Sequence, residues 1–89
     1  MKGTVFKYQI MLGGYIHLDL PTKAVILDIQ IQEGSVVLWA ILNTANPMQS
    51  RTLYSTMTGV EVDINCSYLL PIKTLTDFRG LVWHIFEVV

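Results

Sequence analysis

The stretch AVILDIQIQE, residues 24–33, decides the fold, because apolar residues recur at almost every second position in it. This alternation is typical of a β-strand with one buried face and one face in water. Glu33, Gly34 and Ser35 then predict a tight turn into VVLWAIL, residues 36–42, which is apolar on both faces. The two segments together predict a β-hairpin whose second strand is central in its sheet.

Alternation also assigns the side chains of this hairpin to faces. In the first strand Ile26 is then the one apolar residue on the polar face, and four aliphatic residues share the buried face: Val25, Leu27, Ile29 and Ile31. In the second strand Trp39 occupies one face, and the other face carries Leu38, Ala40 and Leu42.

The rest of the chain repeats this pattern in short segments that are separated by turn residues. Pro71 interrupts one of these segments and favours an edge strand or an irregular segment there. No amphipathic helix of more than a turn or two is present, and the further extended segments are residues 4–10, 15–20, 50–57, 60–64, 67–75 and 81–89. The sequence therefore predicts a single all-β domain over residues 1–89, a compact antiparallel β-sandwich or flattened barrel of about seven or eight short strands.

The composition is unusually apolar for a small domain. Hydrophobic residues make up 52% of the 89 residues and charged residues only 15%, against about 25% in typical domains. A lone monomer of this size buries a modest share of its surface, so we expect part of the apolar surplus to lie at contacts between copies of the chain. The formal net charge of −1 argues against general binding to a DNA or RNA polymer, but it leaves room for a small anion in a local site.

Several classes of site find no support in the sequence. Cys66 is the only cysteine, and no group of Cys and His residues has metal-ligand spacing, so neither a disulfide scaffold nor a metal site is predicted. No nucleophile elbow or Gly-rich phosphate loop is present, so we expect neither an enzyme nor a cofactor. No segment approaches the roughly 20 apolar residues of a membrane span, and we expect a cytosolic protein with no membrane partner.

A few residues admit both a structural and a functional interpretation. Arg51 and Tyr54 stand three apart on one strand and therefore point to opposite faces. Trp39 fits either a packing role or a platform for a ligand ring. His84 fits either a hydrogen-bonded core or interface histidine or a contact to a base or phosphate. Thr58 and Gly59 form an ordinary turn, or they offer a hydroxyl and a backbone amide to a phosphate oxygen.

An ordered set of short motifs resembles a widespread family of small phage proteins of formerly unknown function. The motifs are FKY at 6–8, LDLP at 18–21, ILDIQIQEGSVVLWA at 26–40, Pro47, Arg51, TG at 58–59 and WHIFE at 83–87. This family is similar to the phage anti-CBASS sponges, which bind cyclic dinucleotide alarm signals and keep a bacterial defence effector silent. The chain departs from the family pattern after Tyr68, where LLPIKT stands in place of a GT pair.

This resemblance implies an immune-evasion protein of the host cytoplasm. It would sequester a cyclic dinucleotide, such as cyclic GMP-AMP, without cleaving it, and it would act as a homo-oligomer, with a tetramer favoured over a dimer. On this basis we expect Arg51 to contact phosphate, Tyr8, Trp39 and Tyr54 to stack on bases, and Thr58 and His84 to supply polar contacts. Two rival interpretations remain: a structural or host-protein-binding accessory module that docks through a sheet edge, and an enzyme that degrades the signal.

Overall fold

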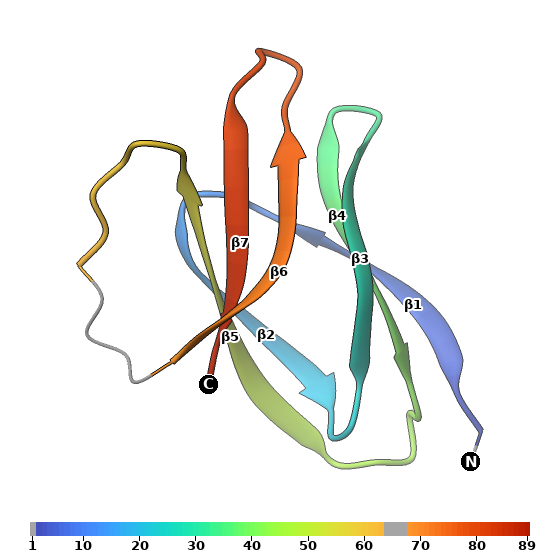
Figure 1. The fold of residues 1–89 in the computed structure, drawn as a ribbon. Helices are drawn as coiled ribbons and strands as arrows, with labels where there is room; N and C mark the ends of the chain where they lie inside the picture. The colour runs from blue at the N-terminus through green and yellow to red at the C-terminus, as the bar shows by residue number, and fades with distance from the viewer. Residues whose placement is uncertain (1, 64–67) are drawn as a thin grey trace.

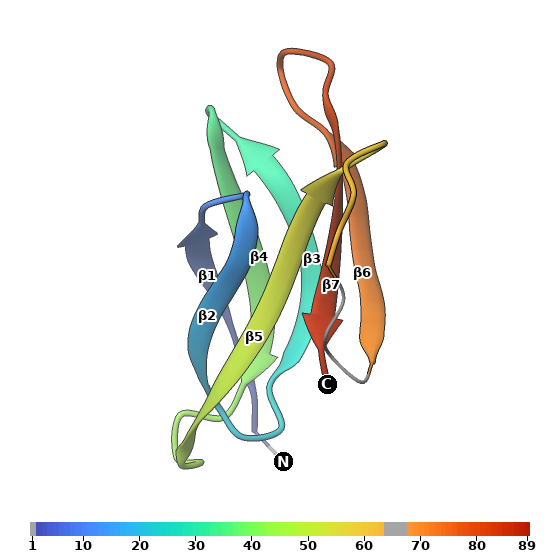
Figure 2. The ribbon, with the colours of Figure 1, turned by 90° about the vertical axis from the view of Figure 1, so that its left-hand side faces the viewer.

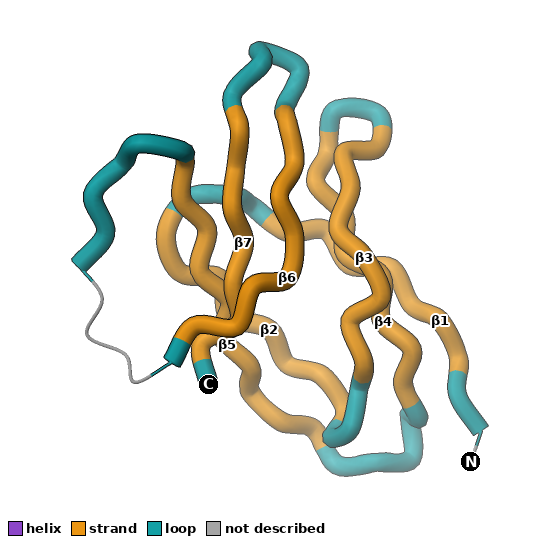
Figure 3. Tube along the Cα trace, viewed as in Figure 1, coloured by secondary structure: helices purple, strands orange, loops and turns teal. Residues whose placement is uncertain are grey.

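The computed structural model describes residues 2–63 and 68–89. Its described residues form seven β-strands, and Figure 3 shows strands and loops but no helix in them. The strands are β1 (Thr4–Ile10), β2 (Gly14–Pro21), β3 (Val25–Gln32), β4 (Ser35–Leu42), β5 (Met48–Met57), β6 (Leu69–Thr76) and β7 (Val82–Val88). The prediction of an all-β fold is confirmed.

The strands form two antiparallel sheets that pack face to face as a sandwich (Figures 1 and 2). One sheet has three strands in the order β1-β4-β3, and the other has four in the order β2-β5-β7-β6. β7 lies between β5 and β6, so the last strand of the chain separates two strands that precede it in sequence. Figures 1 and 2 both show the β6–β7 hairpin extending beyond the β3–β4 hairpin at the top of the view.

The predicted hairpin at residues 24–42 is present. Gln32 pairs with Ser35, and only Glu33 and Gly34 lie between them, with φ angles of 51° and 82°. Two-residue hairpin turns need such positive φ values because their twist matches that of the strands, and glycine adopts them without strain. β4 lies between β1 and β3, as the sequence predicted for a strand that is apolar on both faces.

The core lies between the two sheets. β4 contributes Leu38, Ala40 and Leu42, all buried, while Trp39 lies on the outer face of the same strand, as predicted. From the four-stranded sheet, Leu53 of β5 and Ile85 of β7 are 0% and 1% exposed. Because side chains alternate along a strand, burial of Leu53 and Ile85 fixes the outward direction of their neighbours Tyr54, His84 and Phe86.

The assignment of faces in β3 was wrong at its beginning. Val25 and Leu27 were expected to be buried, but they are 55% and 51% exposed, whereas Ile26 packs against the core. The cause is a shift in the β3–β4 register between Ile26 and Asp28, which reverses the alternation at this point. Beyond the irregularity, Ile29 is buried as predicted.

Two further predictions concern the segments on either side of residues 64–67. The extended segment predicted at 60–64 is not a strand over residues 60–63, and residue 64 and Cys66 lie outside the described residues. β6 is an edge strand with a register shift between Pro71 and Lys73, as the proline indicated.

Candidate functional site

The outer face of the four-stranded sheet gathers polar and aromatic side chains from all four strands. We call it the Tyr54 face. The register of the strand pairs places the following residues on it: Tyr15 and His17 of β2, Thr52, Tyr54 and Thr56 of β5, His84 and Phe86 of β7, and Pro71 and Thr74 of β6. None of these side chains carries a formal charge when the histidines are neutral.

An aromatic row crosses the middle of the Tyr54 face. Tyr15 pairs with Tyr54 across β2 and β5, and Tyr54 pairs with Phe86 across β5 and β7. The rings of Tyr15 and Tyr54 meet edge to face, with centroids 4.8 Å apart at an interplanar angle of 72°. Tyr15 is 55% exposed. The row therefore offers flat apolar surface to which a planar ligand ring can stack.

A row of hydroxyl groups around an imidazole lies beside the aromatic row. His84 stands opposite Thr56 on β5 and Thr74 on β6. Its Nε2 is 2.6 Å from Oγ1 of Thr58, and its Nδ1 is 3.2 Å from Oγ1 of Thr74. Thr58 reaches the ring because its backbone N–H donates to the carbonyl of Val82, which holds the turn after β5 against β7.

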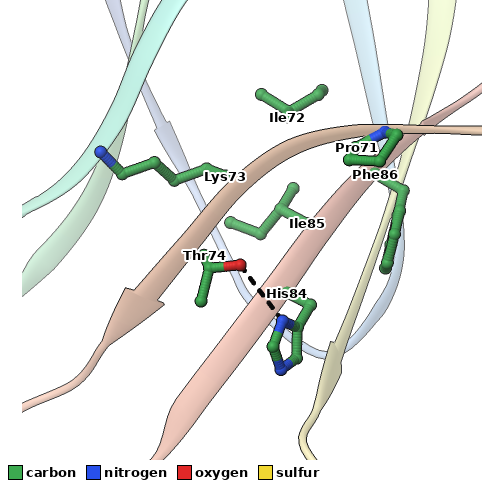
Figure 4. Close-up of a pocket in the computed structure, with 7 residues that line it drawn as sticks. All are labelled: Pro71, Ile72, Lys73, Thr74, His84, Ile85 and Phe86. Carbon is green, nitrogen blue, oxygen red and sulfur yellow. Dashed lines mark hydrogen bonds between the residues drawn. The ribbon is translucent and has the colours of Figure 1, made fainter.

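The β6 side of this row opens into a hollow of about 370 Å³, lined by Pro71, Ile72, Lys73, Thr74, His84, Ile85 and Phe86. Figure 4 shows His84 and Phe86 pointing to the same side of β7, Ile85 pointing to the other, and Lys73 extending away toward β3. There the ammonium of Lys73 pairs with Asp28 at 2.8 Å, and this hydrogen bond is the main cause that lowers the pKa of Asp28.

Arg51 lies on the inner side of the same sheet. Its Nε donates to Oε2 of Glu87 at 2.7 Å, its Nη2 donates to Oε1 at 2.8 Å, and its Nη1 donates to the carbonyl of Ala24 at 2.6 Å. The hydrogen bond to Glu87 raises the pKa of Arg51 above its ordinary value. Arg51 also lines a second hollow of about 370 Å³ between β3 and β6. It therefore points away from Tyr54, as the spacing predicted, with its charge already balanced by Glu87.

Tyr8 and Trp39 belong to the three-stranded sheet and point to its opposite faces. Tyr8 pairs with Leu38 and packs against the core. Trp39 stands between Lys7 and Asp28 on the outer side. Of the six residues singled out from the sequence, the structure brings together Tyr54, Thr58 and His84, and within one chain it holds Tyr8, Trp39 and Arg51 elsewhere.

Most residues of the Tyr54 face were not singled out from the sequence, among them Tyr15, Thr74 and Phe86. Phe86 could have been found from the sequence, because it lies two residues after His84 on one strand and therefore points to the same face. Tyr15 and Thr74 could not have been found in this way, because their positions beside Tyr54 and His84 depend on which strands pair.

A family model described as a domain of unknown function (DUF7352) matches residues 1–89. The chain belongs to this family. No curated protein and no solved structure matched this DUF7352 chain. In the part that the structure describes, no helix is long and apolar enough to cross a membrane. Among residues 2–63 and 68–89, no three His, Cys, Asp or Glu side chains are grouped so as to hold a metal ion.

Proposed function

We propose that this DUF7352 protein binds a cyclic dinucleotide, such as cyclic GMP-AMP, and sequesters it without cleaving it. In a phage-infected bacterium this activity would silence CBASS defence from within the host cytoplasm. The observation that carries the proposal is the convergence of Tyr54, Thr58 and His84, which come from β5, the turn after it and β7, onto one uncharged face beside Tyr15 and Phe86.

The chemistry of the Tyr54 face suits both parts of such a ligand. Stacking of a base on an aromatic side chain contributes roughly 1 to 3 kcal/mol, and the row of Tyr15, Tyr54 and Phe86 offers rings for it. The hydroxyl groups of Thr58 and Thr74, on either side of the His84 imidazole, offer donors for phosphate oxygens. A low formal charge is compatible with this role, because a local site needs only a few placed donors.

A homo-oligomer, with a tetramer favoured over a dimer, is part of the proposal. A cyclic dinucleotide has two bases and two phosphates, and a two-fold axis would present each aromatic row and each hydroxyl group twice. The exposed apolar side chains of the chain support association, since Phe78 is 85% exposed, Met11 83% and Val5 52%.

The direct test is isothermal titration of the full chain with a panel of cyclic dinucleotides. We expect saturable heat with at least one of them, and recovery of that nucleotide intact by chromatography after the protein is denatured. The Thr4→Val variant, at the exposed start of β1 in the other sheet, serves as a folded control that leaves the Tyr54 face unchanged. An absence of heat with every member of the panel would rule the proposal out, and recovery of a cleaved product would replace sequestration with enzymatic turnover.

One observation favours a second candidate function, a module that docks a host protein through a sheet edge. β1 is an edge strand, and its Val5 and Phe6 are 52% and 40% exposed. A long apolar edge is a template for pairing with another chain. This candidate predicts a host partner in pull-down experiments that Val5→Lys abolishes, with no change in nucleotide titrations.

A further inference from the structure

The His84 imidazole has a threonine hydroxyl at each of its two nitrogens. Thr58 lies at Nε2, at 2.6 Å, and Thr74 lies at Nδ1, at 3.2 Å. Thr58 follows β5 and Thr74 belongs to β6, so the ring bridges the two strands that flank β7. Figure 4 shows the contact to Thr74 at the edge of the hollow. We call these three residues the Thr58–His84–Thr74 group.

The number of hydroxyl hydrogens that this group can offer outward depends on its protonation. A neutral imidazole has one N–H and one bare nitrogen, so one threonine must donate its hydrogen to the ring to complete both bonds. An imidazolium has two N–H groups, and it donates to both threonine oxygens. Protonation of His84 therefore frees the second hydroxyl hydrogen and adds a positive charge in the same place.

We infer that the Thr58–His84–Thr74 group is a binding subsite for an oxyanion, of the kind a phosphodiester presents, whose occupation is coupled to the uptake of one proton by His84. This inference rests on the proposed function for the identity of the natural ligand. It adds Thr74 as a ligand-positioning residue, and it makes retention of the ligand dependent on pH. Histidine is suited to this role because its charge changes between about pH 5 and pH 8.

Among the described residues, the two threonine hydroxyls are the groups within hydrogen-bond distance of the His84 nitrogens, and no carboxylate is among them. The described strands and turns around the ring carry several titratable and charged groups. These are Tyr15, His17 and Asp19 of β2, Arg51 and Tyr54 of β5, Glu61 and Asp63 after Thr58, Tyr68 before β6, Lys73 of β6, Asp77 and Arg79 of the β6–β7 turn, and Glu87 of β7. Glu87 is bound by Arg51, and Asp77 accepts a hydrogen bond from Trp83. Lys73 lines the same hollow as His84, but its ammonium extends away from the ring and is paired with Asp28.

Sulfate is the probe for the test, because its charge does not vary over the pH range in which histidine titrates. The imidazole signals of His84 in the ¹⁵N-labelled full chain are followed by NMR from about pH 5 to pH 8, with sulfate or with chloride at matched ionic strength. We expect sulfate to move the titration midpoint of His84 to higher pH, and sulfate affinity to be about tenfold stronger at the acidic end.

His17 and Thr4 supply the controls. Among the described residues, the one side chain at hydrogen-bond distance from the His17 ring is Thr52, 3.3 Å from its Nδ1, so the midpoint of His17 should move much less than that of His84. Thr4→Val, in the other sheet, should keep the effect at His84, whereas Thr58→Val and Thr74→Val should each reduce it. Equal movement of both histidines, or an unchanged effect in the Thr58→Val/Thr74→Val double variant, would overturn the inference.

The two proposals can fail separately. Isothermal titration of the protein with the cyclic dinucleotide, in two buffers that differ in their heat of ionisation, counts the protons taken up on binding. Tight binding without proton uptake at any pH would refute the coupling and leave the sequestration proposal intact. Sulfate coupling at His84 in a chain that binds no cyclic dinucleotide would support the proton-coupled oxyanion subsite and refute the sequestration proposal.

Discussion

Arg51 and Glu87 form a two-point ion pair inside the sandwich, with N–O distances of 2.7 and 2.8 Å, although 36 residues separate them in sequence. Only 18% of the Arg51 side chain and 12% of the Glu87 side chain are exposed. Arg51 also donates to the carbonyl of Ala24, directly before β3. The pair therefore links β5 and β7 of one sheet to the start of a strand in the other.

Removal of one partner of this pair should destabilise the fold. We expect Arg51→Met to lower the free energy of unfolding by roughly 3 kcal/mol, because Glu87 is left as a charge with little access to water. The double variant Arg51→Met/Glu87→Leu should recover most of the loss, since no unpaired charge remains. Urea denaturation measures both, with the exposed Lys7→Met as control. An equal loss in the single and double variants would show that packing, and not charge, sets the cost.

The turn between β6 and β7 should be sensitive to acid. Partial burial acts to raise the pKa of Asp77, but hydrogen bonds from Trp83, Leu81 and Arg79 outweigh it and lower the pKa to about 2, from 3.8 in an unfolded chain. A carboxyl group whose pKa is lowered by folding stabilises the protein fully above its unfolded pKa. We therefore expect this stabilisation to be present above about pH 4 and lost as the pH falls toward 2.

Asp77→Asn isolates this contribution from those of the other carboxylates. The difference in melting temperature between wild type and Asp77→Asn should be largest at neutral pH and should shrink below about pH 4. Thermal unfolding followed by circular dichroism at a series of pH values measures it. A difference that is independent of pH would mean that the charge of Asp77 contributes nothing.

Ser55 is a polar residue within the core, 1% exposed. Its Oγ accepts a hydrogen bond from the backbone N–H of Gly13 at 2.6 Å and donates to the carbonyl of Gly14 at 3.4 Å. Ser55→Ala should lower the free energy of unfolding by about 1 kcal/mol, because the Gly13 N–H loses its acceptor. Amide exchange at Gly13 should become faster. Thr56→Val, one residue away on the outer face, should change stability much less, and equal effects would contradict this account.

The two outer faces of the sandwich should differ in ligand binding. If a base stacks on the Tyr54 face, Tyr54→Ala should weaken the affinity for the cyclic dinucleotide by about tenfold, as expected for loss of one stacking contact. Trp39→Phe, on the outer face of the other sheet, should change it little. Isothermal titration of both variants, after a check that they are folded, measures the two affinities. An equal loss of affinity in Tyr54→Ala and Trp39→Phe would place Trp39 in the ligand site as well.

Local patterns in the sequence were sufficient for most strands, but not for their irregularities. The alternation in β3, the turn at Gly34 and the apolar run of β4 were predictable, because each depends on neighbouring residues. The exposure of Val25 and Leu27 was not, because a shift of register leaves no mark on composition. The segment at 60–63 alternates like a strand and yet forms none, since none of the seven described strands pairs with it.

The candidate site shows the same division. The opposite directions of Arg51 and Tyr54 followed from their spacing alone. The contacts of His84 with Thr58 and Thr74 did not, because they require that β7 lie between β5 and β6. Likewise, the residues next to Arg51 in the sequence did not show that its guanidinium would pair with the carboxylate of Glu87.

The positions of the two tryptophans determine how the protein can be studied by fluorescence. Trp39 lies on the outer face of the three-stranded sheet. Trp83 packs against the core, and its indole N–H donates to Asp77. Neither indole belongs to the Tyr54 face, so a nucleobase seated there would not quench either one by contact. A change in native emission on adding nucleotide would instead report subunit association or strand movement, and Tyr15→Trp would install a reporter at the stacking row itself.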